Sequence, residues 1–257
     1  MNIEEKIKEL ENNSNSQQKM LESISSDIKE VMWANVYHDT VRGCPWFPEG
    51  GLPCWPGRGA VGYQYMYVAF RILNELQPTS ILEIGMGQST RLIGQFIKTR
   101  NYDKDYRHYC IEHDANWSEI CKQQFPLDEE RSEVIVLPLT TMSFTDEKGN
   151  SRDTIIYDGF FDALNGKKFQ LISVDGPYGF NDPLYSRIDI LEIIPQCLSN
   201  DFCILIDDYD RPGERRMTEA LMFKLKEAGV EHEGGVYVGK KQMAIITSPS
   251  WAFLRLM

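Results

Sequence analysis

The residues with the clearest chemistry lie where a short apolar run meets a glycine-rich turn. Residues 81–84, Ile-Leu-Glu-Ile, lead directly into Gly-Met-Gly-Gln-Ser-Thr at 85–90, where a helical pattern begins. A strand, a tight turn and a helix N-terminus in this order are typical of a nucleotide-binding element. A dinucleotide-binding turn would have a third glycine in place of Thr90, and the acid Glu83 at the strand end would repel a pyrophosphate. The turn therefore favours a cofactor without phosphates, such as S-adenosylmethionine (SAM); the alternative is a purely structural glycine turn.

A carboxylate about one βα unit later supports this interpretation. Residues 109–112, Tyr-Cys-Ile-Glu, form a short apolar run that ends in Glu112, where a doubly wound sheet offers an acid to ribose hydroxyls. An isolated acid there would more simply face solvent, but its spacing from the glycine turn favours a bidentate hydrogen bond to the ribose. A third strand is expected at 134–137, after which Thr140 borders the adenine. The candidate cofactor-binding residues are Glu83, Gly85, Gly87, Ser89, Thr90, Glu112 and Thr140.

These two motifs resemble the class I SAM-dependent methyltransferases. The matching pieces are the turn at 83–90 and the Ile-Glu-His-Asp step at 111–114, and the resemblance extends over residues 77–247. It implies a SAM-binding α/β domain.

Three aspartates follow two further apolar runs. Asp175 comes after 169–174, and Asp207 and Asp208 come after 202–206. Because the carboxyl ends of parallel strands converge on one crevice, we expect these three side chains to share one site. Clustered carboxylates repel one another unless one is protonated or a cation lies between them, and oxygen ligands suit Mg²⁺, with Mn²⁺ or Ca²⁺ as substitutes. The alternative is ordinary polar strand ends that face solvent.

The aspartates narrow the resemblance to metal-dependent O-methyltransferases of the macrocin O-methyltransferase type, which act on sugar hydroxyls. An Asp-Gly step and an Ile-Asp-Asp-Tyr step supply the metal ligands there, which implies Asp175, Asp207 and Asp208 as ligands here. That family places an aspartate base directly after the Asp-Gly pair, whereas this chain has Pro177. Asp175 and Asp182 are the candidate catalytic residues, and Asp182 alternatively has a loop or helix-capping role.

The resemblance implies methyl transfer from SAM to a sugar hydroxyl, of a nucleotide-linked sugar or a glycoside, in surface-polysaccharide or natural-product biosynthesis. A divalent ion, Mg²⁺ or Mn²⁺, would lower the pKa of the acceptor hydroxyl and fix the angle of attack. Two other functions stay open: metal-dependent O-methylation of catechol-like small molecules, and a catalytically silent SAM-fold scaffold.

Composition restricts the partners and the compartment. The chain has 257 residues, 42% of them hydrophobic, which suffices for one large α/β core with an appendage. A net charge of −11 opposes binding to nucleic acid, which depends on Lys and Arg. No apolar run approaches the ~20 residues that span a bilayer, and the N-terminus shows no signal-peptide core. We therefore expect a cytoplasmic protein with reduced cysteines, no membrane span and a small-molecule substrate.

The first 33 residues predict an oligomerisation helix. Apolar residues recur there at alternating spacings of three and four, with Ser14 and Gln17 at two intervening positions; they are Ile3, Ile7, Leu10, Leu21, Ile24, Ile28 and Val31. Such a narrow stripe suits pairing of helices in a homo-oligomer. The alternative is an amphipathic helix that packs on its own domain, broken near 12–16.

The rest of the chain predicts a lid with a leading helix at 34–76 and a methyltransferase domain at 77–257. Residues 38–62 contain four prolines and two tryptophans, Trp46 and Trp55, which either stack on a sugar or pin the loop to the core. Further elements are expected as a helix at 64–76, a hairpin at 145–161, a helix at 214–228 and strands near 235–238 and 242–247. The predicted fold class is α/β, with a doubly wound, Rossmann-like SAM methyltransferase sheet, an antiparallel terminal strand and an N-terminal helical extension.

Overall fold

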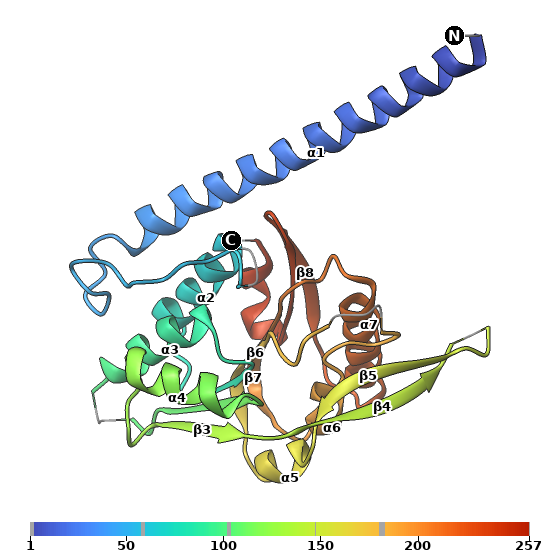
Figure 1. Cartoon of the computed structure of the whole chain (residues 1–257). Coiled ribbons are helices and arrows are strands. Elements are labelled where there is room, and N and C mark those ends of the chain that lie inside the picture. Colours follow the sequence, from blue (N-terminus) through green and yellow to red (C-terminus); the bar gives the residue numbers. More distant parts are fainter. Residues whose placement is uncertain (1–2, 58–59, 102–103, 147, 180–182, 257) are drawn as a thin grey trace.

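A seven-stranded sheet forms the centre of the protein (Figure 1). The computed structural model describes residues 3–57, 60–101, 104–146, 148–179 and 183–256. The strands of this sheet are β1 (Ser80–Ile84), β2 (Arg107–Glu112), β3 (Ser132–Val136), β6 (Phe169–Val174), β7 (Leu198–Ile206), β8 (Glu233–Val238) and β9 (Gln242–Thr247). They lie in the order β3-β2-β1-β6-β7-β9-β8; β9 is antiparallel to both neighbours and the other pairs are parallel. The predicted doubly wound sheet with an antiparallel terminal strand is confirmed.

Helices cover both faces of the sheet, because neighbouring strand residues enter opposite cores. Ile81 packs on one face with α2 (Tyr63–Glu75) and α3 (Gln88–Lys98). Leu82 packs on the other face, where the helices are α5 (Phe160–Leu164), α6 (Ile190–Ile193) and α7 (Pro212–Glu227). Helix α4 (Ala115–Gln124) contacts β3, and the 3₁₀ helix η1 (Pro249–Leu256) contacts β8. Burial on both faces explains why β1, β6, β9 and the second half of β7 are almost unbroken apolar runs in the sequence.

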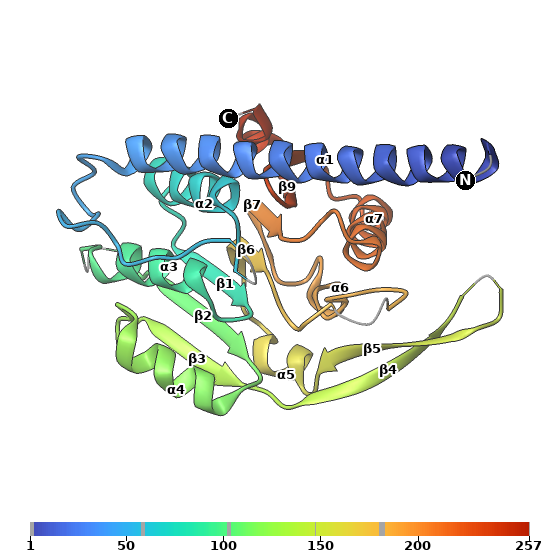
Figure 2. The same ribbon diagram turned by 45° about the horizontal axis from the view of Figure 1, so that its top comes forward.

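A two-stranded arm leaves the domain between β3 and β6. It consists of β4 (Leu139–Thr145) and β5 (Ser151–Tyr157), which pair antiparallel and project past α6 (Figures 1 and 2). The hairpin expected at 145–161 therefore begins six residues earlier than predicted, at Leu139. Thr140 belongs to this arm and pairs with Ile156, since the β-branched and apolar residues of 139–145 match 151–157 in a regular ladder.

Helix α1 (Ile3–Val41) is longer than predicted and unbroken (Figure 2). Residues 38–41, expected in the irregular segment, form its last turn. Its second half lies on the domain: Trp33 Nε1 donates to the Val238 carbonyl at 3.0 Å, and Lys240 Nζ lies 2.6 Å from Asp27 Oδ1. Tyr37 is buried at the end of the same face. The contacts extend the helix because Trp33 and Tyr37 gain a partner surface there.

The predicted apolar stripe of α1 stays largely exposed. Its described side chains, Ile7, Leu10, Leu21, Ile24, Ile28 and Val31, are between 46% and 67% exposed. The side chains that contact the domain lie on a different face of the helix. In the part of the chain that the structure describes, no helix is long and apolar enough to cross a membrane.

The two tryptophans of the irregular segment differ in environment. Trp46 is buried, its ring stacks on Phe70 with centroids 5.1 Å apart, and its Nε1 donates to Asn74 Oδ1 at 3.0 Å. Trp55 is 67% exposed, with the Arg91 guanidinium 5.3 Å from its ring centroid. Trp46 therefore pins the loop to the core, whereas Trp55 leaves a ring face at the surface.

Candidate functional site

The cavity that gathers the predicted chemistry lies at the carboxyl ends of β1, β2, β6 and β7. We call it the central cavity; its volume is about 530 Å³. Its lining residues come from the loops after these strands and from neighbouring segments: Ala60, Gly85, Met86, Gly87, Gln88, Glu112, His113, Asp114, Trp117, Tyr157, Asp175, Gly176, Pro177, Tyr178, Arg187, Asp208 and Arg211. A concave site with a few convergent polar groups is the usual form of a small-molecule site.

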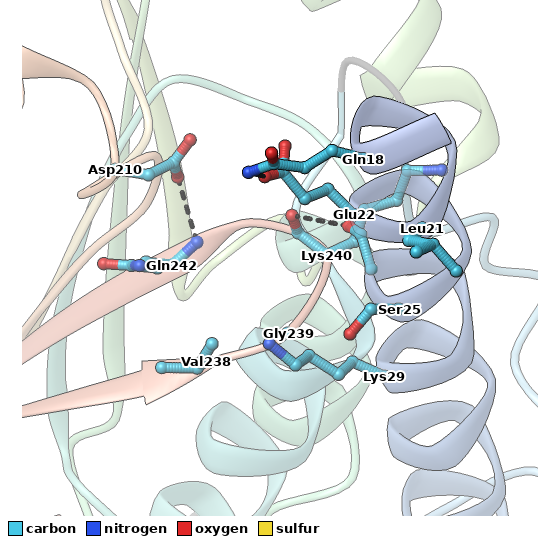
Figure 3. Close-up of a pocket in the computed structure, with 11 residues that line it drawn as sticks. Gln18, Leu21, Glu22, Ser25, Lys29, Asp210, Val238, Gly239, Lys240 and Gln242 are labelled. Carbon is cyan, nitrogen blue, oxygen red and sulfur yellow. Dashed lines mark hydrogen bonds between the residues drawn. The ribbon is translucent and has the colours of Figure 1, made fainter. Parts of the chain in front are cut away.

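Two other cavities lack the predicted residues. One of about 600 Å³ lies between the end of α1 and the loop that follows it. Another, of about 480 Å³, lies between α1 and the β8–β9 turn, where Gln18, Glu22 and Lys240 line it (Figure 3). None of the candidate cofactor, metal or catalytic residues lines either cavity, so the central cavity is the candidate site.

The two glycines of the β1–α3 turn have different tasks. Gly85 has a φ of +92°, and a Cβ there would lie 2.9 Å from the Asp175 carbonyl oxygen. Glycine at 85 therefore lets the turn after β1 contact the backbone after β6. Gly87 lines the central cavity, and a Cβ there would have no other atom within 4 Å. Both glycines line the central cavity, and of the two it is Gly87 that has open space where a Cβ would lie.

Glu112 joins the turns after β1 and β2. Its Oε2 accepts a hydrogen bond from the Met86 N–H at 3.0 Å, and its Oε1 accepts from the N–H groups of His113 and Asp114 at 2.7 and 2.9 Å. Trp117 Nε1 donates to the Met86 carbonyl at 2.9 Å. His113 Nδ1 also lies 2.8 Å from Oε1 of Glu112, and the bidentate contact with a ribose stays a prediction.

Glu83, Ser89 and Thr90 lie behind the turn and do not line the central cavity. Glu83 is fully buried: Ser89 Oγ donates to its Oε1, and His108 Nε2 lies 3.3 Å from its Oε2. Thr90 Oγ1 accepts from the Gly87 N–H at 2.9 Å. Their placement gives these three residues a supporting role, since buried partners already hold the side chains expected to meet the cofactor.

Two other candidates are not among the described residues of the central cavity. Thr140, on the β4–β5 arm, does not line the central cavity. Asp182 lies outside the described residues.

The structure brings Asp175, Asp207 and Asp208 together as an acid cluster. One carboxylate oxygen of each lies within 4.8 Å of the others. The cause is the parallel pairing of β6 and β7, which sets Val174 opposite Ile206 and ends both strands at the same edge. Asp175 and Asp208 line the central cavity, whereas Asp207 is fully buried behind them.

Two cationic side chains that the sequence analysis did not identify lie on this cluster. Arg187 Nη2 lies 3.0 Å from Asp175 Oδ1 and 2.8 Å from Asp208 Oδ2. Lys241 Nζ lies 3.2 Å from Asp207 Oδ2 and 3.0 Å from Asp208 Oδ1. The expectation of a cation between the acids is thus met by protein side chains.

Arg211 and Glu214 extend the charge network at the start of α7. Arg211 Nη1 lies 2.9 Å from Asp208 Oδ2 and 3.5 Å from Glu214 Oε1. Glu214 is fully buried, and its Oε1 lies 3.9 Å from Arg187 Nε. Four carboxylates and three cations therefore share this space.

The environment separates the three aspartates by pKa. Burial raises the pKa of Asp175 to about 6 and that of Asp207 to about 7. Burial also opposes ionisation of Asp208, but the nearby Arg187 and Lys241 outweigh it and lower its pKa below the usual value. Asp208 thus ionises more readily than a free aspartate, and Asp175 titrates nearer to neutral pH.

A divalent ion does not fit the acid cluster as it is arranged. Both oxygens of Asp208 and one oxygen each of Asp175 and Asp207 lie within 3.2 Å of a side-chain nitrogen. Asp207 Oδ1 is buried without a hydrogen-bond partner, but Mg²⁺ demands near-octahedral oxygen ligation at ~2.0–2.1 Å. The metal-ligand role predicted for these aspartates therefore disagrees with their contacts, because the ligand oxygens already bind cationic side chains.

Several methyltransferases are similar to this chain in structure, although no family model and no curated protein sequence matches it. A putative caffeoyl-CoA O-methyltransferase from Staphylococcus aureus is 13% identical with a TM-score of 0.46, over 83% of this chain and 91% of that one. The SAH-bound methyltransferase PaMTH1 from Podospora anserina is 16% identical with a TM-score of 0.44, over 85% and 86%. The N-methyltransferase NodS from Bradyrhizobium japonicum is 12% identical with a TM-score of 0.38, over 87% and 98%. At these identities the similarity concerns the fold alone.

Proposed function

We propose that this chain is a SAM-dependent O-methyltransferase and that the central cavity receives both cofactor and acceptor. One observation carries the proposal: the open backbone at Gly87, the acid Glu112 and the carboxylate Asp175 line the same cavity. A cofactor seated against Gly87 and Glu112 would share its space with a carboxylate able to take a proton.

Asp175 is the proposed general base. SAM, when bound, supplies an electrophilic methyl group on a sulfonium, which transfers to an acceptor oxygen in line with the departing sulfur. Asp175 lines the cavity with an 18% exposed side chain, and Arg187 Nη2 lies against its Oδ1. It takes the hydroxyl proton as the oxygen–methyl bond forms and the sulfur–methyl bond breaks. A base works best with a pKa near the working pH, and the pKa of Asp175 is raised to about 6.

The proposed acceptor is a sugar hydroxyl of a nucleotide-linked sugar or a glycoside. This part of the proposal rests on the resemblance carried by the Asp-Gly and Ile-Asp-Asp-Tyr steps at 175–176 and 206–209. Arg211 supports it, because this residue lines the cavity and a guanidinium is the type of group that binds a diphosphate.

Titration calorimetry with SAM and S-adenosylhomocysteine tests the cofactor, and a panel of nucleotide sugars and catechols with methyl-labelled SAM tests the acceptor. Both cofactor forms should bind wild-type protein. Glu112→Gln should weaken SAM binding on the order of tenfold or more, because a charge-assisted hydrogen bond is worth on the order of 1.5–3 kcal/mol. A folded protein that binds neither form would be a scaffold and would contradict the proposal.

The exposed stripe of α1 supports a homo-oligomer as a second part of the proposal. The stripe has the narrow spacing that pairs helices, and its described apolar side chains are between 46% and 67% exposed. A second copy of α1 presents the complementary stripe, so we propose self-association through this face.

A further inference from the structure

We infer that Arg187 and Lys241 take the place of a divalent ion at the acid cluster, so that the proposed methyl transfer is independent of metal. The activity half of this inference rests on the proposed function. The binding half, that the cluster holds no divalent ion, stands by itself.

The two cations divide the cluster between them. Arg187 Nη2 bridges Asp175 and Asp208, and Lys241 Nζ bridges Asp207 and Asp208. Asp208 thus has one cation on each oxygen and joins both halves. This is the connectivity that a bridging metal would provide, made with nitrogen donors.

Both cations are anchored by further contacts. Arg187 is 3% exposed, and its Nη1 donates to the Asp207 carbonyl at 3.0 Å. Lys241 Nζ donates to the Ala60 carbonyl at 2.9 Å, and Gln64 Nε2 donates to the Lys241 carbonyl at 3.1 Å. Each side chain is therefore held at the cluster by the backbone around it.

The backbone is strained where the cluster is assembled. Arg187 and Asp208 have φ values of 55° and 57°, in the left-handed region that non-glycine residues rarely adopt. Such residues persist only where their surroundings hold them, and they concentrate at functional sites. The strain at both ends of the Arg187–Asp208 pair supports a built contact rather than an incidental one.

Charge balance also opposes a metal. Asp175, Asp207, Asp208 and Glu214 face Arg187, Lys241 and Arg211, which leaves at most one uncompensated negative charge. A divalent ion would exceed that charge. It would also have to displace Arg187 or Lys241 from carboxylates in a buried site, leaving a cation there without its partner.

In this arrangement Arg187 and Lys241 are positioning residues. Arg187 fixes Asp175 at the cavity wall, and Lys241 fixes Asp208, which in turn holds Arg187. The cluster therefore orients the proposed base without presenting a Lewis acid to the acceptor hydroxyl.

The first experiment is a titration of full-length wild-type protein with Mn²⁺, followed by the electron paramagnetic resonance signal of free Mn²⁺. We expect no binding that depends on the cluster, so wild type and Asp208→Asn should give the same curve. Stoichiometric binding of one Mn²⁺ per chain that Asp208→Asn removes would overturn the inference. This titration uses neither SAM nor acceptor, so it decides the question even if SAM fails to bind and the proposed function is wrong.

The second experiment compares Lys241→Met with Lys240→Met, a matched control that removes the neighbouring lysine on the same turn. Lys241→Met should strengthen Mn²⁺ binding about tenfold or more, because a like charge at the cluster no longer repels the ion, and Lys240→Met should not. A folded Lys241→Met protein with no gain over the control would contradict the inference. If Lys241→Met does not fold, the wild-type titration still decides.

The third experiment tests the activity half with metal-free wild-type protein in excess chelator. Methyl transfer should be unchanged by the chelator and by added Mg²⁺ or Mn²⁺. Loss of turnover that Mg²⁺ restores would overturn metal independence, whereas absence of SAM binding in calorimetry would instead refute the proposed function.

Discussion

Arg187 Nη2 lies 2.8 Å from Asp208 Oδ2, and both side chains are almost fully removed from solvent. The same nitrogen also lies 3.0 Å from Asp175 Oδ1, so one guanidinium joins the loops that follow β6 and β7. Because these loops form the wall of the central cavity, this contact fixes both the shape of the wall and the place of its carboxylates.

Replacing Arg187 should destabilise the protein strongly. Arg187→Met removes the cation that pairs with Asp175, while Asp208 keeps Lys241 and Arg211, and breaking a buried pair on one side costs about 3–5 kcal/mol. Chemical denaturation measures the change, with Arg42→Met as control. Arg42 pairs with Asp39 at the surface, where both side chains are more than 70% exposed, so its loss should cost less than about 1 kcal/mol. Equal effects of the two substitutions would show that the Arg187 contacts contribute little.

A side chain at Gly87 should block the cofactor without disturbing the fold. Gly87→Val places its new atoms in open space in the central cavity, so SAM affinity should fall by more than tenfold while the melting temperature changes little. Gly50→Val is the matched control, because a Cβ at Gly50 also meets open space but lies outside the cavity. Calorimetry and thermal melting give both readouts. If the Gly87→Val variant binds SAM as tightly as wild type, the cofactor does not lie against Gly87.

The pH profile of methyl transfer should follow the ionisation of the Asp175 carboxyl group. The base must be ionised to accept a proton, and burial raises the pKa of Asp175 to about 6, so kcat/KM should fall as the pH drops through about 6 and level off above it. Asp175→Asn should lower kcat much more than SAM affinity, and Asp39→Asn, a surface control, should leave both unchanged. A wild-type profile that is flat between pH 5 and pH 8 would remove Asp175 from this role.

Charges on the outer stripe of α1 should lower the assembly state. Leu21→Glu combined with Ile28→Glu puts like charges into the proposed seam, and light scattering should then give a smaller mass than wild type. Asn15→Glu combined with Ser23→Glu is the control, because these exposed residues lie off the stripe. An unchanged mass in the seam variant would show that assembly, if any, uses another surface.

The sequence predicts most of the fold because an acidic residue marks the carboxyl end of several buried strands. Glu83, Glu112, Asp175 and Asp207 all lie at the ends of apolar runs, and the topology of parallel strands then brings these ends together. The convergence of the aspartates needs no more than this rule.

The partners of the acids could not be predicted in the same way. Lys241 lies 34 residues from Asp207 in the sequence, on the turn between β8 and β9. No local sequence pattern indicates that its side chain reaches the aspartates. The same limit explains why the sequence predicts Glu83 as a cofactor ligand. Its position in the motif suggests that role, but its carboxylate contacts the buried side chains of Ser89 and His108. Local spacing identifies which residues reach a shared edge, but contacts across the sheet decide which of them face the cavity.

The last turn of the sheet links two parts of the protein that the sequence treats separately. Lys240 binds Asp27 on α1, and the adjacent Lys241 binds Asp208 in the acid cluster. The contacts of α1 and those of the acid cluster therefore meet at two adjacent residues of the β8–β9 turn.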